Sequence, residues 1–196
     1  MNVILKDVYK AYKDKTVVKG CNLTFPEGKV TCLMGPSGCG KTTILRLIMG
    51  LERADKGIIQ GIEGKRLSAV FQEDRLCESF TAPANILMVA PKNVSKEEVI
   101  RHLEEIGLRD CFHKPVSEFS GGMKRRVAIV RAILSSGDLI LLDEPFKGLD
   151  KENLRLTAAY IRRYTKKATV IMVTHSLEEA ELLEADDIIN IDDYLY

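Results

Sequence analysis

The chain has 196 residues, which is the size of one domain or of one domain that carries a subdomain. Its 29 Lys and Arg residues nearly balance 28 Asp and Glu residues, so the formal net charge is +1. This balance gives no reason to expect broad binding to nucleic acid or to a charged membrane surface, and specificity must come from local groups of residues.

The first part of the chain contains strand patterns around a glycine-rich loop. Apolar and polar residues alternate in the first two segments, and an apolar segment leads directly into the loop. After the loop, apolar residues from Ile44 to Leu51 recur at helical spacing, which predicts a strand-loop-helix unit. Strands are predicted over 2–9, 17–25, 29–34 and within 57–71.

The second part of the chain is helical at first and then alternates between helices and strands. Ser95 with Glu98 forms a capping-box pattern before a helix that ends at Gly107, and residues 75–135 are predicted to be mainly helical. Later helices are predicted over 121–135, 151–167 and 177–184, and strands over 139–143, 169–173 and 187–191. Such alternation predicts an α/β fold with a largely parallel sheet and a helical insertion.

A phosphate-binding loop is predicted between the third strand and the helix that follows it. Residues 35–42 read GPSGCGKT and match G-x-x-x-x-G-K-[ST]. The glycines let backbone N–H groups point at phosphate oxygens, and the helix that begins near Lys41 adds the positive end of its dipole. We expect Lys41 to bridge the β- and γ-phosphates and the Thr42 hydroxyl to bind Mg²⁺. A glycine-rich turn with an incidental lysine would not account for the flanking strand and helix.

Two carboxylates follow the apolar strand at 139–143, in the sequence LILLDEP. We expect Asp143 to hold Mg²⁺, and Glu144 to orient or deprotonate the water that attacks the γ-phosphate. A solvated acidic turn after an ordinary strand is the plain alternative. The phosphate-binding loop upstream favours the catalytic interpretation, so the sequence predicts an ATPase.

A second set of backbone donors is predicted in FSGGM, residues 119–123. A serine followed by two glycines at the start of a helix exposes N–H groups that can bind an anion. Alone, this pattern more often marks a helix N-cap beside a flexible loop. Its place between the phosphate-binding loop and the two carboxylates favours a functional role.

Taken together, these motifs resemble those of the nucleotide-binding subunits of ABC transporters over nearly the whole chain, and chance assembly of six motifs in this order is negligible. The six are the Walker A loop GPSGCGKTT at 35–43, the Q-loop residue Gln72 in VFQEDRL, the signature FSGGM at 119–123, Walker B LILLDEP at 139–145, the D-loop GLD at 148–150, and the switch residue His175 in VTHS. The resemblance implies a P-loop NTPase core with a mainly parallel sheet, an N-terminal antiparallel β subdomain and an inserted α-helical subdomain.

The resemblance also implies that two copies of the chain share each site. In this family the dimer is head-to-tail, and the signature of one copy closes over ATP on the Walker A loop of the other. Ser120, Gly121 and Gly122 would then complete the γ-phosphate cage and withhold catalysis until the dimer closes. His175 would contact the γ-phosphate and help to hold the water, and Gln72 would touch Mg²⁺ and that water.

The expected site residues fall into three groups. Those for catalysis are Glu144, His175, Lys41 and Gln72, and those for Mg²⁺ are Thr42, Gln72 and Asp143. Those for ATP are Tyr12, Gly35, Pro36, Ser37, Gly38, Cys39, Gly40, Lys41, Thr42, Thr43, Ser120, Gly121, Gly122 and Asp150. Tyr12 aligns with the aromatic residue that stacks on adenine in this family, although Tyr9 is close enough to compete, and an exposed aromatic on a strand is the alternative for both.

Several details resemble the importers of the family. Phe119 and Met123 replace the commoner Leu and Gln of the signature, and a methionine before basic residues is typical of importer variants. The segment VFQEDRLCESFTAPANI looks most like the nitrate, sulfonate and taurine class. The resemblance therefore implies membrane permease subunits that dock near Gln72 and residues 73–90, and a solute-binding protein outside the cytoplasm that acts through the complex. A soluble ABC-type ATPase of DNA repair, translation or iron-sulfur assembly is the alternative.

The expected location is the cytoplasm, at the inner face of the membrane. Five cysteines lie scattered without a C-x-x-C pair, as in free thiols of a reducing compartment, and the first residues lack the apolar region of a signal peptide. The longest apolar runs are far shorter than the roughly 18 to 20 residues of a membrane span. We expect a single ABC ATPase domain, in which about 1–72 and 137–196 form the core with the β subdomain and about 73–136 form the helical signature subdomain.

Overall fold

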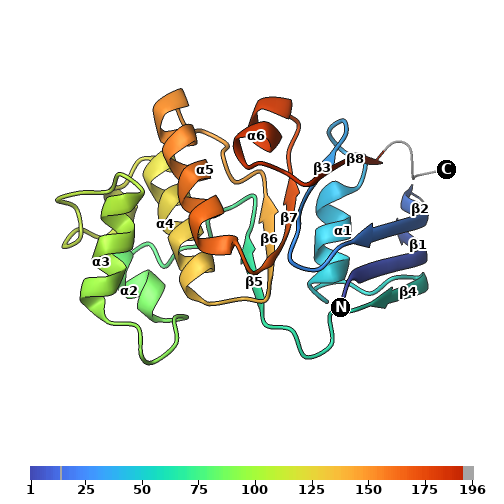
Figure 1. Cartoon of the computed structure of the whole chain (residues 1–196), viewed down its shortest axis with the longest axis horizontal. Helices are drawn as coiled ribbons and strands as arrows, with labels where there is room; N and C mark the ends of the chain where they lie inside the picture. Colours follow the sequence, from blue (N-terminus) through green and yellow to red (C-terminus); the bar gives the residue numbers. More distant parts are fainter. Residues whose placement is uncertain (14, 192–196) are drawn as a thin grey trace.

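The fold contains two β-sheets, one parallel and one antiparallel (Figure 1). The computed structural model describes residues 1–13 and 15–191. The parallel sheet has the strand order β5 (Leu67–Val70), β6 (Leu139–Asp143), β7 (Thr169–Val173), β3 (Val30–Met34) and β8 (Asp187–Asn190). The antiparallel sheet has the order β2 (Lys15–Phe25), β1 (Val3–Tyr12) and β4 (Lys56–Gln60). The predicted combination of a parallel core sheet with an antiparallel β unit is confirmed.

Helices cover both faces of the parallel sheet. Helix α1 (Lys41–Ile48) lies between the two sheets, and the helices α2 to α5 lie on the other side of the parallel sheet (Figure 1). The remaining helices are α2 (Ala82–Leu87), α3 (Lys96–Glu105), the 3₁₀ turn η1 (Val116–Glu118), α4 (Gly121–Leu134), α5 (Lys151–Thr165) and α6 (Leu177–Leu182). This arrangement is the α/β fold with a helical insertion that the sequence predicted.

The parallel sheet separates two hydrophobic cores. Successive side chains of a strand point to opposite faces. On β6, Ile140 and Leu142 pack with the helices α2 to α6, whereas Leu139 and Leu141 pack with α1 and the antiparallel sheet. Every side chain of β6 and β7 is therefore buried, which explains why these segments read as nearly continuous apolar runs.

The insertion contains longer loops than predicted. Residues 73–81 and 107–115 contain no helix, although 75–135 was predicted to be mainly helical. A buried amide replaces the helical hydrogen bonds in the first loop: Asn85 Oδ1 accepts from the Cys77 N–H at 2.7 Å, and Asn85 Nδ2 donates to the carbonyls of Cys77 and Thr81 at 3.1 Å. The Asn85 side chain therefore holds this loop in place, and the spacing of apolar residues in the sequence does not reveal such a contact.

None of the helices in the described residues combines the length and hydrophobicity that crossing a membrane requires.

Candidate functional site

The candidate site lies at one edge of the parallel sheet. Strands β3, β5, β6 and β7 are parallel, so their carboxyl ends meet at the same edge, where α/β sheets bind ligands. The segments that leave these ends carry the Walker A loop, Gln72, Glu144 and His175. Residues up to 140 positions apart in the chain are thus brought together by strand order alone.

The Walker A loop depends on glycines with positive φ. The φ angles are 146° at Gly35 and 105° at Gly40, which L side chains rarely adopt. A Cβ at Gly35 would lie 2.7 Å from Cγ2 of Ile191, and one at Gly40 would lie 2.9 Å from the Val17 carbonyl oxygen. Gly40 also precedes α1 without a side-chain cap, so the N–H groups of the first turn are left for a ligand.

The Lys41 side chain turns back over the loop. Its Nζ donates to the carbonyl oxygens of Gly35 at 2.7 Å and Pro36 at 2.8 Å, and lies 3.7 Å from Sγ of Cys39. Lys41 is only 8% exposed. An ammonium group is strongly hydrated in water, so a buried one needs other partners, and the two carbonyl oxygens take that place here. An anion bound in the loop would be an alternative partner for the Lys41 ammonium group.

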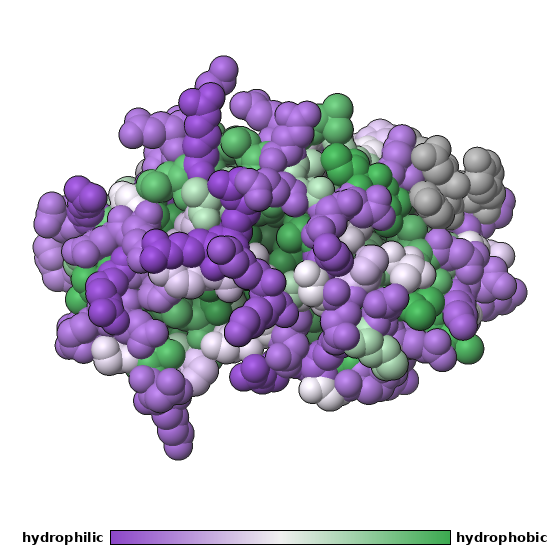
Figure 2. Space-filling view, viewed as in Figure 1, coloured by the Kyte–Doolittle hydropathy of each residue, from purple (hydrophilic) through white to green (hydrophobic). Residues whose placement is uncertain are grey.

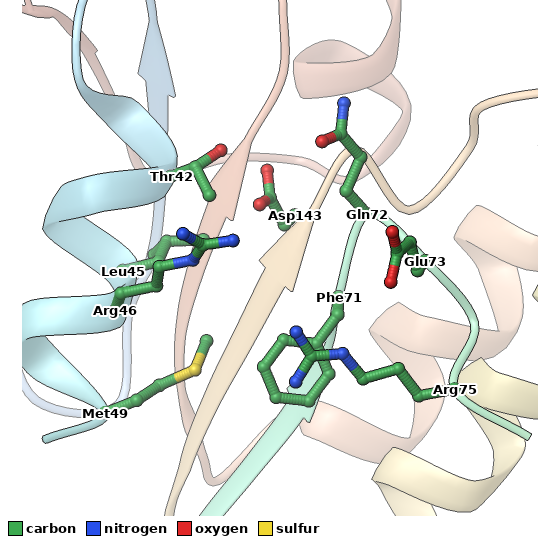
Figure 3. Close-up of a pocket in the computed structure, with 9 residues that line it drawn as sticks. All are labelled: Thr42, Leu45, Arg46, Met49, Phe71, Gln72, Glu73, Arg75 and Asp143. Carbon is green, nitrogen blue, oxygen red and sulfur yellow. The ribbon is translucent and has the colours of Figure 1, made fainter. Parts of the chain in front are cut away.

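Oxygen donors for a divalent cation lie beside the loop. Thr42, Gln72 and Asp143 line a cavity of about 70 Å³, and their polar ends lie near one another in Figure 3. Burial raises the pKa of Asp143, while a hydrogen bond from Thr42 opposes that rise. A cation would favour the ionised form of the carboxylate and so oppose that rise, and a hydroxyl with a carboxylate is the ligand type that Mg²⁺ prefers. Among the described residues, no cluster of three or more His, Cys, Asp or Glu forms a separate metal site.

The predicted catalytic carboxylate lies in a neighbouring cavity of about 230 Å³. Glu144 lines this cavity together with Lys41, Thr42 and Gln72. Its Oε1 lies 3.9 Å from Nδ1 of His175. Three of the four predicted catalytic residues therefore line one cavity, and the exposed side chain of His175 lies next to it, beside Glu144.

Lys147 is a neighbour of Glu144 that the sequence interpretation did not include. Its Nζ lies 3.5 Å from Oε2 of Glu144. The spacing of three residues was the available signal, but an exposed lysine at that spacing is common and carries little information.

The serine-glycine donors lie in a different cavity of the chain. Ser120, Gly121, Gly122 and Asp150 line a cavity of about 500 Å³, together with Gln72. Ser120 caps α4 by accepting from the Met123 N–H at 3.3 Å, and Asp150 caps α5 through the Asn153 N–H at 2.9 Å. The Walker A residues line the other two cavities. Gln72 is the residue that all three cavities share.

The two candidate tyrosines of β1 differ in surroundings. Tyr12 is 40% exposed, its hydroxyl donates to Glu52, and it also interacts with Thr43 at the start of α1. Tyr9 is half-buried, and its hydroxyl lies 3.0 Å from the position that a Cβ on Gly20 would occupy. Tyr12 therefore has the ring available beside the Walker A loop, whereas Tyr9 packs within the antiparallel sheet.

Comparison with known families matches residues 18–147 to the family described as ABC transporter. The chain is similar to the aliphatic sulfonates import ATP-binding protein SsuB 1 of Pseudomonas syringae pv. syringae, with 37% identity over 88% of this chain and 73% of that protein. It is also similar to the bicarbonate transport ATP-binding protein CmpD of Synechococcus elongatus, with 35% identity over 92% of this chain and 72% of that protein.

Solved structures show the same fold. The dimeric structure of MJ0796, a bacterial ABC transporter cassette, superposes with a TM-score of 0.85 at 26% identity and covers 96% of this chain and 93% of that one. A second dimeric structure of MJ0796, in a post-hydrolysis state bound to ADP and Pi, superposes with the same TM-score at 27% identity. These neighbours are assembled from two cassettes.

Proposed function

Because the chain belongs to the ABC transporter family, as a subunit of the importer type that binds and hydrolyses ATP, we propose that two copies share each catalytic site. The observation that carries this proposal is the separation of the two anion-binding groups. In one chain the Walker A loop and the Ser120 segment line different cavities. A head-to-tail dimer would bring the Ser120 segment of one copy to the loop of the other.

Within each site, we assign the loop and the carboxylates different tasks. Lys41 exchanges its bonds with the Gly35 and Pro36 carbonyls for phosphate oxygens, while the N–H groups at the start of α1 hold the phosphates. Glu144 orients the attacking water and accepts its proton, and His175 holds the water and the γ-phosphate from the rim.

Magnesium fits the oxygen donors beside the loop. Thr42, Asp143 and Gln72 would hold it. Because Asp143 is buried, its ionised carboxylate would be stabilised by pairing with a cation. When bound, Mg²⁺ neutralises charge on the phosphates.

We propose that the helical signature subdomain, about 73–136, moves relative to the core, about 1–72 and 137–196. Helices α2, α3 and α4 pack on one another, which supports their treatment as a unit. The segment after β5, which carries Gln72, joins this unit to the core.

An apolar groove offers a docking place for the permease. It has a volume of about 360 Å³ and is lined by Met49, Leu51, Leu67, Phe71 and Val89, with Leu51 56% exposed and Val89 49% exposed. Hydrophilic side chains cover much of the face in Figure 2, with smaller hydrophobic areas between them. An apolar groove of this kind is typical of a protein interaction site.

The groove is connected to the site through Phe71. Phe71 lines both the groove and the cavity of Thr42 and Asp143, and it directly precedes Gln72. A permease segment seated in the groove would therefore contact the residue next to the Q-loop glutamine. We propose that this contact places the chain at the inner face of the membrane, and that a solute-binding protein outside the cytoplasm acts through the same complex. The import functions in the names of its relatives favour this role over that of a soluble ABC-type ATPase.

Replacing Leu51 by Glu is expected to reduce co-purification with the permease about tenfold or more, because a charge would enter an apolar groove. The measurement is recovery of co-expressed permease subunits on the tagged chain, alongside Mg²⁺-dependent ATPase activity of the chain alone. The matched control is Ile58→Glu, since Ile58 is an exposed apolar residue, 57% exposed, on β4. Equal permease recovery with Leu51→Glu and wild type would rule out docking in this groove.

Removing the Tyr12 ring is expected to raise the KM for ATP about tenfold with little change in kcat, since base stacking on an aromatic ring is worth about 1–3 kcal/mol. The measurement is ATPase activity of Tyr12→Ala as a function of ATP concentration. Tyr9→Ala serves as the control, because Tyr9 packs against Gly20 and its loss should lower thermal stability instead. A larger KM increase for Tyr9→Ala than for Tyr12→Ala would assign stacking to Tyr9.

A further inference from the structure

One side chain of α4 contacts the Q-loop at three points, two on the backbone and one on a side chain. The guanidinium of Arg125 donates to the carbonyl oxygen of Phe71 at 2.6 Å and to that of Gln72 at 2.5 Å. Its Nε lies 3.1 Å from Oδ1 of Asp74. The planar fork of arginine suits two carbonyl acceptors and a paired carboxylate at fixed positions, which an ammonium group cannot match.

This contact lies in a largely buried setting. Arg125 is 5% exposed, and the Asp74 side chain is 20% exposed. Hydrogen bonds to charged groups strengthen where water is excluded, so the contact is costly to break and favours one position of the Q-loop.

A second arginine continues the attachment further along the loop. Arg131 donates to the carbonyl oxygen of Asp74 at 2.8 Å and to that of Arg75 at 2.7 Å. This second contact is more remote from Gln72 in the chain, so Arg125 is the residue that holds the backbone at Gln72 itself.

The same helix begins at the serine-glycine segment. Ser120 caps α4, and Arg125 lies in its second turn. Gln72 lines the cavity of Lys41 and Glu144 as well as the cavity of Ser120 and Gly121. The Q-loop and the signature are thus joined by a short segment of regular helix and one buried side chain.

We infer that Arg125 is a positioning residue that makes the two ATP sites of the dimer cooperative. The inference rests on the proposed function, in which the signature of each chain serves the ATP of its partner. ATP on the Walker A loop of one chain acts on Gln72 of that chain. Arg125 then holds the Q-loop and α4 together, so the Ser120 segment moves with Gln72 and alters the partner's site.

The test is the ATP dependence of hydrolysis by the purified full chain. The wild type is expected to show a Hill coefficient between 1 and 2, the upper limit for two sites. Arg125→Gln removes the fork and is expected to bring the coefficient to about 1. Arg125→Lys keeps the charge without the fork and is expected to give an intermediate value, and it decides the question if Arg125→Gln does not fold.

A stability control separates positioning from packing. Ile129 is fully buried on the same helix, and Ile129→Val should lower thermal stability by removing one methylene group. We expect this variant to keep the wild-type Hill coefficient. Cooperativity lost equally in Ile129→Val and Arg125→Gln would show that general loosening of α4 is responsible, and would overturn the inference.

ATP-driven dimerisation in a Glu144→Gln background gives a second readout that does not depend on turnover. With Arg125→Gln added, half-maximal dimerisation is expected to need at least about five times more ATP, the lower end of typical coupling between sites. If Glu144→Gln dimerises and the added substitution changes nothing, the role of Arg125 is overturned while the proposed function stands. If Glu144→Gln alone does not dimerise with ATP, both are overturned.

Discussion

Replacing Glu144 by Gln is expected to slow ATP hydrolysis about 10²- to 10⁴-fold and to leave a stable ATP-bound dimer. The amide matches the carboxylate in shape but cannot accept a proton from the attacking water. It also removes a negative charge from the cavity that Glu144 shares with Lys41, which should favour retention of the anionic γ-phosphate. Binding is thereby kept while the chemical step is lost.

The measurement combines steady-state ATPase assays with size-exclusion chromatography in the presence and absence of MgATP. Glu73→Gln is the matched control, because Glu73 is an exposed acid that lines the neighbouring cavity of Thr42 and Asp143. Its neutralisation is expected to change turnover less than about threefold, as a surface charge at the rim contributes little. A Glu144→Gln chain that stays monomeric with ATP and hydrolyses at the wild-type rate would contradict the assigned role.

The fold could be predicted in large part because its signals are local. The segment 139–143 is apolar at every position, which is typical of a strand covered on both faces, and two acids follow it at once. Parallel strands then place the ends of β3, β6 and β7 at one edge. The position of Lys41, Asp143 and Glu144 around two neighbouring cavities follows from that geometry, without knowledge of any single contact.

Contacts between distant segments could not be predicted in the same way. Arg125 and Gln72 are 53 residues apart, and Arg125 belonged only to a basic stretch in the sequence interpretation. The buried amide of Asn85 holds a loop that periodicity had assigned to helix. Tyr9 and Tyr12 both lie on β1, and the difference between them depends on their neighbours Gly20 and Glu52, which the sequence pattern does not reveal.

Mixing two inactive variants is expected to restore activity if each site is built from two copies. Lys41→Ala removes the ammonium group from the Walker A loop. Gly121→Asp puts a carboxylate on the segment that is expected to face phosphate, and a Cβ at Gly121 meets no atom within 4 Å in the folded chain, so the substitution should leave the fold intact. Each variant alone is expected to lose about 10² or more in kcat.

In a mixed dimer, the unaltered Walker A loop of the Gly121→Asp copy meets the unaltered signature of the Lys41→Ala copy. Random pairing makes half of the dimers mixed, each with one complete site, so activity up to roughly a quarter of wild type is expected. Lys41→Ala mixed with Asp143→Asn is the control, since both changes lie on the Walker side and every site then carries one of them. Restoration in the first mixture but not in the second requires that a site take its loop from one chain and its Ser120 segment from the other. Equal, unrestored activity in both mixtures would instead place each complete site within a single chain, and the 500 Å³ cavity around Ser120 would then need another role.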